Sequence, residues 1–104
     1  MLINKQTQLS EDKIFGFKLL SGEEIIGRVG SISDTDVTVH APHQLAANEQ
    51  GVGLAPFIGM IHDDADPVFL RTNILAIFEP NTQFVKAYES ATSVILTPSS
   101  QIAT

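Results

Sequence analysis

Residues 17–39 read FKLLSGEEIIGRVGSISDTDVTV, and this stretch decides the fold. The apolar pattern of Ile14–Leu20 predicts a first strand, which ends at Ser21-Gly22. Glycine accepts the positive φ that a tight hairpin turn needs, so Gly22 is predicted to be critical for this turn. A second strand, Glu23–Ile32, follows with apolar residues on both of its faces.

Two glycines, Gly27 and Gly30, lie inside this second strand pattern. A glycine inside a strand lets the strand bend sharply or lets another backbone approach, and Gly27 is the predicted bend. A polar turn at residues 33–35 leads to clean alternation over Asp36–Ala41, after which Pro42 predicts an edge or a bulge. The whole stretch therefore predicts a bent antiparallel β-meander, the front half of a small barrel.

Further apolar stretches follow at Gly51–Ile61, Val68–Leu70 and Ile74–Phe78, and residues 43–50 are expected to be an irregular strand or a loop. Strands at this spacing predict an all-β barrel or sandwich. An open barrel leaves unpaired backbone groups on its edge strands. We expect residues 53–61 and 74–78 to be these edges and to pair with a second copy of the chain.

The pattern changes at Pro80, and Asn81 is a predicted N-cap for a helix over Thr82–Thr92. Four apolar residues at helical spacing are expected to pack on the barrel or on a neighbouring subunit: Phe84, Val85, Tyr88 and Ala91. The predicted division of the chain is a mobile arm or short helix at 1–13, a barrel at 14–79, a helix and extension at 80–96, and a flexible tail at 97–104.

The composition indicates one domain that is partly covered by a neighbour. Of the 104 residues 43% are hydrophobic and only 17% are charged. Cysteine is absent, which excludes disulfides and thiolate metal sites and favours an intracellular setting. The N-terminal residues lack the apolar core of a signal peptide, and no apolar run reaches the length of a membrane span. We therefore expect a cytoplasmic protein without a membrane partner, in the host cytoplasm if the source is viral.

The net charge of −6 comes from six Lys/Arg and twelve Asp/Glu, with no basic block. Duplex DNA binding needs several cations that face phosphates, so duplex DNA is excluded as a partner. Single-stranded RNA remains open for two reasons. A homo-oligomer repeats one arginine per subunit around its axis, and single strands are recognised by stacking more than by bulk charge.

Groups suited to catalysis or metal binding form no convincing pattern. Six residues have metal-ligating side chains: His40, His43, His62, Asp63, Asp64 and Asp66. His40 is expected to point outward and His43 follows a proline, so an acidic solvated turn is predicted instead of a metal site. Glu23 and Glu24 fall on opposite faces of their strand and cannot share a substrate. The sequence also lacks a phosphate loop and a nucleophile elbow, so we expect a protein that is not an enzyme and has no cofactor.

Two motifs together resemble the Sm and Sm-like (LSm) family. The family's first motif has a hydrophobic-x-Gly turn, a mid-strand glycine and an acidic turn before an apolar strand. Its counterparts here are Leu20-Ser21-Gly22, Gly27-Arg28-Val29, Asp34 and Val37-Thr38-Val39. The second motif is an aliphatic residue, then Arg-Gly-Asn/Asp and an apolar strand, and Leu70-Arg71-Thr72-Asn73-Ile74 is similar to it.

The chain is also similar to short Sm-like proteins of tailed phages. These share a Leu-x-Gly-Glu-x-Ile-Ile/Val start and a Glu-Pro followed by a helix that carries a tyrosine. The matching residues are Leu20, Gly22, Glu23, Ile25, Ile26, Glu79, Pro80 and Tyr88. This likeness suggests a viral origin.

The resemblance implies a strongly bent five-stranded Sm-like (SH3-type) open barrel that closes into a ring of about five to seven copies. It implies non-catalytic binding of single-stranded RNA by Asp34, Asp36, Arg71, Thr72 and Asn73. Asp36 falls where the family has Asn, and Thr72 where it has Gly. Because a carboxylate repels phosphate, these departures favour an alternative function, a phage structural, assembly or protein-binding ring that has lost RNA binding. Arg71 likewise has two interpretations, a pore-facing RNA contact or a structural arginine that pairs with an Asp or a turn carbonyl.

Overall fold

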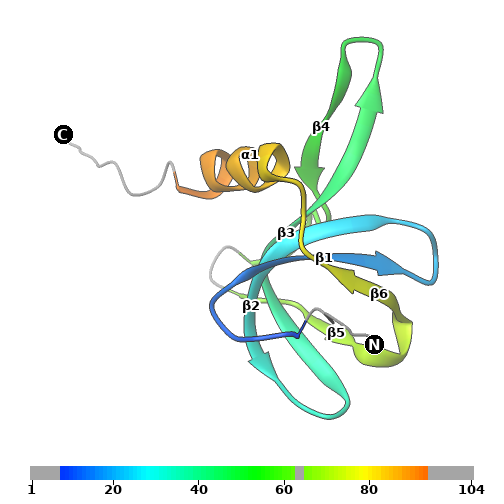
Figure 1. The fold of residues 1–104 in the computed structure, drawn as a ribbon, viewed down its shortest axis with the longest axis vertical. Coiled ribbons are helices and arrows are strands. Elements are labelled where there is room, and N and C mark those ends of the chain that lie inside the picture. Colours follow the sequence, from blue (N-terminus) through cyan, green and yellow to red (C-terminus); the bar gives the residue numbers. More distant parts are fainter. Residues whose placement is uncertain (1–7, 63–64, 94–104) are drawn as a thin grey trace, which may run out of the picture.

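The computed structural model describes residues 8–62 and 65–93 of the chain. These residues form a mostly antiparallel β-sheet with a single C-terminal helix, as predicted (Figure 1). The strands are β1 (Ile14–Leu19), β2 (Glu24–Ile32), β3 (Asp36–Asn48), β4 (Gly51–Pro56), β5 (Val68–Leu70) and β6 (Ile74–Phe78). A 3₁₀ turn, η1 (Arg71–Asn73), joins β5 to β6, and α1 spans Thr82–Ser93.

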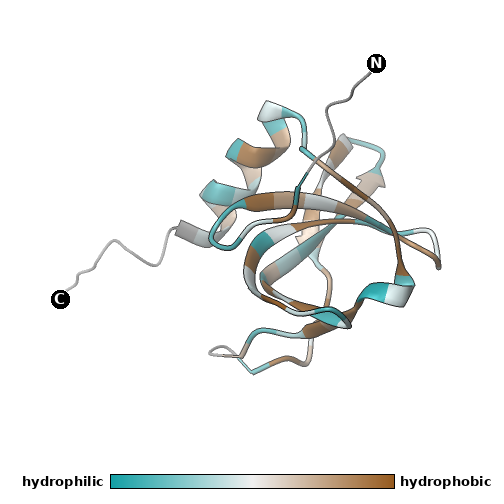
Figure 2. Cartoon of the chain, turned by 60° about the horizontal axis from the view of Figure 1, so that its bottom comes forward, coloured by the Kyte–Doolittle hydropathy of each residue, from teal (hydrophilic) through white to brown (hydrophobic). Residues whose placement is uncertain are grey.

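All the strands belong to one sheet in the order β4-β3-β2-β1-β6, and β5 pairs with the first residues of β3. The sheet curves around an interior, and hydrophobic and hydrophilic residues alternate along its strands (Figure 2). The β1–β2 hairpin forms as predicted: Gly22 has a φ of 109° and its N–H donates to the carbonyl of Leu19 at 2.9 Å. Within residues 8–62 and 65–93, β4 and β6 end the sheet and β5 offers a further open edge.

The described residues form six strands, one more than the five that the Sm-like resemblance implies. Strand β3 is longer than the predicted Asp36–Ala41, because it continues past Pro42 to Asn48 and pairs with β4 through Leu45 and Leu54. The second half of β3 and β4 thus form a long hairpin that projects from the sheet (Figure 1). Residues 57–61, predicted as part of an edge strand, are not in a strand.

A β-bulge lets the chain pass Pro42. Arg28 of β2 lies opposite His40, but Ile26 lies opposite His43, so one extra residue is accommodated on β3. Ala41 takes a φ of 46° at this point. The bulge removes the need for a ladder N–H at the proline, which explains how Pro42 is tolerated inside a central strand.

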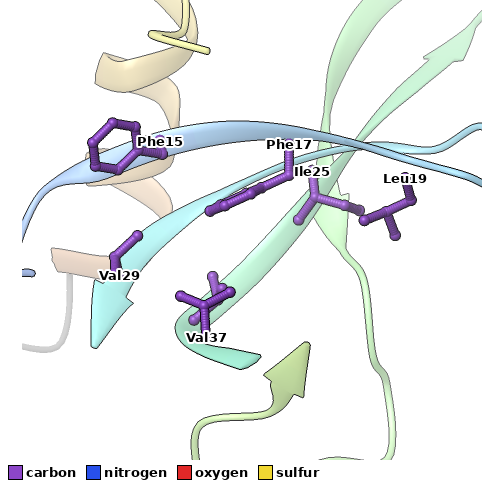
Figure 3. Packing of buried hydrophobic residues seen from close by; sticks show 7 residues of the cluster. Phe15, Phe17, Leu19, Ile25, Val29 and Val37 are labelled. Atoms are coloured by element: carbon purple, nitrogen blue, oxygen red, sulfur yellow. The ribbon is translucent and has the colours of Figure 1, made fainter. Parts of the chain in front are cut away.

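The core lies inside the curve of the sheet (Figure 3). Its buried members come from β1, β2 and β3: Phe15, Phe17, Leu19, Ile25, Val29, Val37 and Val39. Phe17, Val29, Val37 and Val39 are each exposed by no more than 1%, which is why the alternation predicted for these strands is kept. In the described part of the predicted N-terminal arm, residues 8–13, a turn at residues 11–13 is held to β2 by hydrogen bonds between Asp12, Lys13 and Val29. Residues 1–7, 94–96 and 97–104, for which an arm, an extension and a tail are predicted, lie outside the described residues.

Helix α1 begins as the sequence predicted. Oδ1 of Asn81 accepts a hydrogen bond from the N–H of Gln83 at 2.9 Å, which is the N-cap interaction. The helix packs against the sheet within its own chain, where Tyr88 is 1% exposed, whereas Ala91 is exposed. The sheet of the same chain therefore buries Tyr88.

The phenol of Tyr88 enters the β2–β3 ladder beside the bulge. Its oxygen accepts a hydrogen bond from the N–H of Arg28 at 3.1 Å and its hydroxyl donates to the carbonyl of His40. Arg28 and His40 are opposite each other in the register, so the phenol bridges two groups that face one another across the strands. Burial raises the pKa of Tyr88, because the ionised phenolate is poorly solvated there.

We predict that Gly27→Ala destabilises the fold by about 1–3 kcal/mol. A Cβ on Gly27 would collide with Cγ1 of buried Val39 and lie 3.2 Å from the carbonyl oxygen of His40. Gly53→Ala is the matched control, since a Cβ there would meet nothing within 4 Å. Urea unfolding of both variants measures the difference, and equal stabilities would show that the close approach at Gly27 does not constrain the bend.

We also predict that Tyr88→Phe lowers the free energy of unfolding by about 1–3 kcal/mol, because the facing N–H and C=O lose their bridge. The folded pKa of Tyr88 is raised, so its contribution is complete below the unfolded pKa of about 10 and is lost as pH rises through the folded value. Wild-type stability should therefore decline above that pH more steeply than the stability of the variant. The chain has one tyrosine, so tyrosinate absorbance follows the same group directly. Parallel stability profiles for the two proteins would contradict the bridge.

Candidate functional site at the turn end of the sheet

The five residues predicted to bind RNA gather at one end of the molecule. Asp34 and Asp36 lie at the β2–β3 turn, while Arg71, Thr72 and Asn73 form η1, which follows β5. Two backbone hydrogen bonds hold η1 in place. The N–H of Arg71 donates to the carbonyl of Thr35 at 2.9 Å, and the carbonyl of Asn73 accepts from Leu20 at 2.9 Å. Segments that are far apart in sequence are thus brought together by the curve of the sheet.

Arg71 supports the neighbouring turn. Its Nη1 donates to the carbonyl oxygen of Ser33 at 2.8 Å, and no ion pair joins it to Asp34 or Asp36 in the structure. The sequence analysis named two possible structural partners for Arg71, an Asp or a turn carbonyl, and the Ser33 contact is of the second kind. The guanidinium has five N–H donors, and the bond to Ser33 uses one of them.

Asp36 is turned into the same loop. Its Oδ1 accepts a hydrogen bond from Oγ of Ser33 at 3.0 Å, and its N–H donates to Oγ of Ser33 at 3.0 Å. Asp34, Thr72 and Asn73 are exposed. The site therefore combines one guanidinium with two carboxylates, which leaves it with a negative formal charge that opposes phosphate binding.

An apolar groove of about 550 Å³ lies next to this site, and the sequence analysis did not identify it. Leu20, Val68 and Leu70 line it and are 60%, 57% and 54% exposed, and Asn73 lies at its border with η1. Val68 and Leu70 share one face of β5, because side chains two apart on a strand point the same way. The apolar residues of β5 were visible in the sequence, but the sequence did not show that Val68 and Leu70 line a groove.

The carboxylates of the β1–β2 hairpin are engaged separately. Oγ of Ser21 donates to the carboxylate of Glu23 and lowers the pKa of this group. Glu24 forms an ion pair with Lys18, with Nζ and Oε2 3.7 Å apart. The two acids thus have different partners, in keeping with the predicted separation of their side chains.

The three histidines all line one pocket of about 320 Å³ beside β3. Nδ1 of His40 lies 2.9 Å from Oδ1 of Asp66. Within residues 8–62 and 65–93 there is no group of three His, Asp or Glu side chains that could hold a metal ion. Asp63 and Asp64, named in the predicted acidic turn, lie outside the described residues.

No family model matches this chain, and no curated protein matches it either. Among the described helices, none has the length and apolar character needed to cross a membrane.

Proposed function

We propose that this chain is a non-catalytic, ring-forming assembly protein of the Sm-like type that binds protein partners. The observation that carries this proposal is the pair of open sheet edges, β5 and β6, both lined by exposed large apolar side chains. The sequence resemblance to Sm-like proteins, among them those of tailed phages, supports the ring. The bent antiparallel sheet with an added C-terminal helix is compatible with a barrel of that type.

The two edges have matching chemistry. The edges carry three exposed apolar side chains: Val68 and Leu70 on β5 are 57% and 54% exposed, and Leu75 on β6 is 64% exposed. Only 17% of the residues in the chain are charged. Leu75 is the extra residue of a bulge, since Leu19 lies opposite Ile74 and Lys18 lies opposite Ala76. Pairing β5 of one copy with β6 of the next would satisfy both ladders and cover these side chains. Head-to-tail pairing of this kind yields a ring when the rotation closes.

Charge favours a protein partner over RNA for such a ring. Asp34 and Asp36 flank the one arginine of the turn site, and Arg71 already supports the carbonyl of Ser33. The net charge of −6 per chain would add up around a ring and repel a polyanion. Single-stranded RNA is the second candidate, which the exposed Thr72 and Asn73 beside Arg71 favour, because their polar groups can reach base edges.

We predict that the purified chain elutes as an oligomer of about five to seven copies that resists dilution. Leu75→Lys should convert it to a species of 11.2 kDa, because the charge would be buried at the edge-to-edge contact. Met60→Lys is the matched control, since Met60 is 97% exposed and belongs to neither β5 nor β6. Light scattering coupled to gel filtration gives the masses. A wild-type monomer at every concentration would refute the ring.

The RNA candidate predicts that uridine-rich or adenine-rich single strands bind the ring at low salt, with an affinity that falls as salt rises. Arg71→Ala should then weaken binding at least about tenfold, since a charge-assisted contact to phosphate or base is lost. Lys86→Ala, which removes an exposed cation from α1, should leave binding almost unchanged. Fluorescence anisotropy measures the affinities, and light scattering checks that each variant remains a ring. If the wild type fails to bind at low salt, RNA is eliminated and the protein-binding ring stands.

A further inference from the structure

We propose that His40 and His43 form a binding site for a divalent transition-metal ion that prefers nitrogen ligands, such as Cu²⁺. This inference is independent of the ring and of RNA. It begins with the bulge at Ala41 and Pro42. On a regular strand, residues three apart are expected to point to opposite faces.

The bulge reverses that expectation. His40 lies opposite Arg28 and His43 lies opposite Ile26, and these two partners are two apart on β2. Residues two apart on a strand share a face, and directly opposed residues share it too. His40 and His43 therefore stand on the same face of β3, as neighbours two positions apart would on a regular strand. Both side chains line the same pocket of about 320 Å³.

Hydrogen bonds select the ring nitrogen that each histidine presents. Nδ1 of His40 lies 2.9 Å from Oδ1 of Asp66, and Nδ1 of His43 lies 2.8 Å from the carbonyl oxygen of Ala41. A carboxylate and a carbonyl can only accept, so in both rings Nδ1 carries the proton and donates it. The neutral rings then keep their lone pairs on Nε2. Histidines that bind metals are commonly oriented in this way, by a carboxylate or a backbone carbonyl on the other nitrogen.

The surroundings also hold the pair in position. The ring of His43 meets the ring of Tyr88 edge-on, with centroids 5.6 Å apart, and the carbonyl of His40 accepts the hydroxyl of the same tyrosine. Because no third ligand lies close enough among the described residues, the site offers two protein nitrogens and leaves further positions for water. Imidazole ligation with open positions suits Cu²⁺ best among the divalent first-row ions, followed by Ni²⁺ and Zn²⁺.

The test uses the full chain after treatment with chelator, titrated with Cu²⁺ in a buffer that does not bind metal. We expect one ion per chain by calorimetry and an electron paramagnetic resonance spectrum that shows coupling to two equivalent imidazole nitrogens. His40→Gln and His43→Gln should each weaken binding at least about tenfold. Asp66→Asn should weaken it about tenfold as well, because loss of the supporting carboxylate lowers metal affinity by about 10–100-fold.

Two controls separate this site from other binding. Glu49→Gln removes an exposed carboxylate at the tip of the β3–β4 hairpin and should leave the affinity unchanged. His62→Gln should also leave it nearly unchanged, and a loss as large as that of His40→Gln would overturn the two-nitrogen assignment. Undiminished binding in the double variant His40→Gln/His43→Gln, or a spectrum with a single nitrogen, would overturn the proposal itself. Because His40 and Asp66 are exposed, their variants should fold even if His43→Gln, which loses the ring contact to Tyr88, does not.

Discussion

The bridge that Tyr88 makes between the N–H of Arg28 and the carbonyl of His40 is the interaction on which the rest of this structure depends. A bulge interrupts the β2–β3 ladder beside these two groups. Buried backbone donors and acceptors without partners are costly, so an interruption near the centre of a sheet needs a substitute. The phenol supplies both halves of that substitute, since it accepts from one strand and donates to the other. The docking of α1 and the bend of the sheet are therefore parts of one arrangement.

Gly27 has a matching role on the other strand. A side chain there would collide with Val39, which is 1% exposed and belongs to the core. The backbone of β3 can come close to β2 at the bulge only because this position lacks a Cβ. Three residues from different elements thus form the bulge region together: Gly27 on β2, Pro42 on β3 and Tyr88 on α1. The long β3–β4 hairpin begins just beyond this point.

Local signals in the sequence were sufficient for the elements of the fold but not for their long-range contacts. The Ser21-Gly22 turn, the alternation around Val37 and Val39, and the Asn81 cap each depend on a few adjacent residues, and each occurs as predicted. Pro42 predicted an edge or a bulge, and the structure has the bulge. The sequence did not show that β3 continues beyond it, because the bulge depends on a glycine 15 positions earlier. The bridge by Tyr88 spans 48 residues to His40, and periodicity places a tyrosine on a helix face without showing where its hydroxyl goes. The chemistry of arginine predicted an Asp or a turn carbonyl as the structural partner of Arg71. The Ser33 carbonyl could be identified only from the packing of η1 against the turn.

The same bulge also determines on which face of β3 the two histidines lie. Periodicity assigns faces by counting residues, and one inserted residue shifts every later side chain of the strand to the other face. On β3 the insertion falls between His40 and His43, so a spacing of three behaves as a spacing of two. The bulge at Pro42 therefore brings two imidazoles to one surface. A bulge held by a helix residue keeps them there, because the register of β3 cannot slip without breaking the bridge to Tyr88.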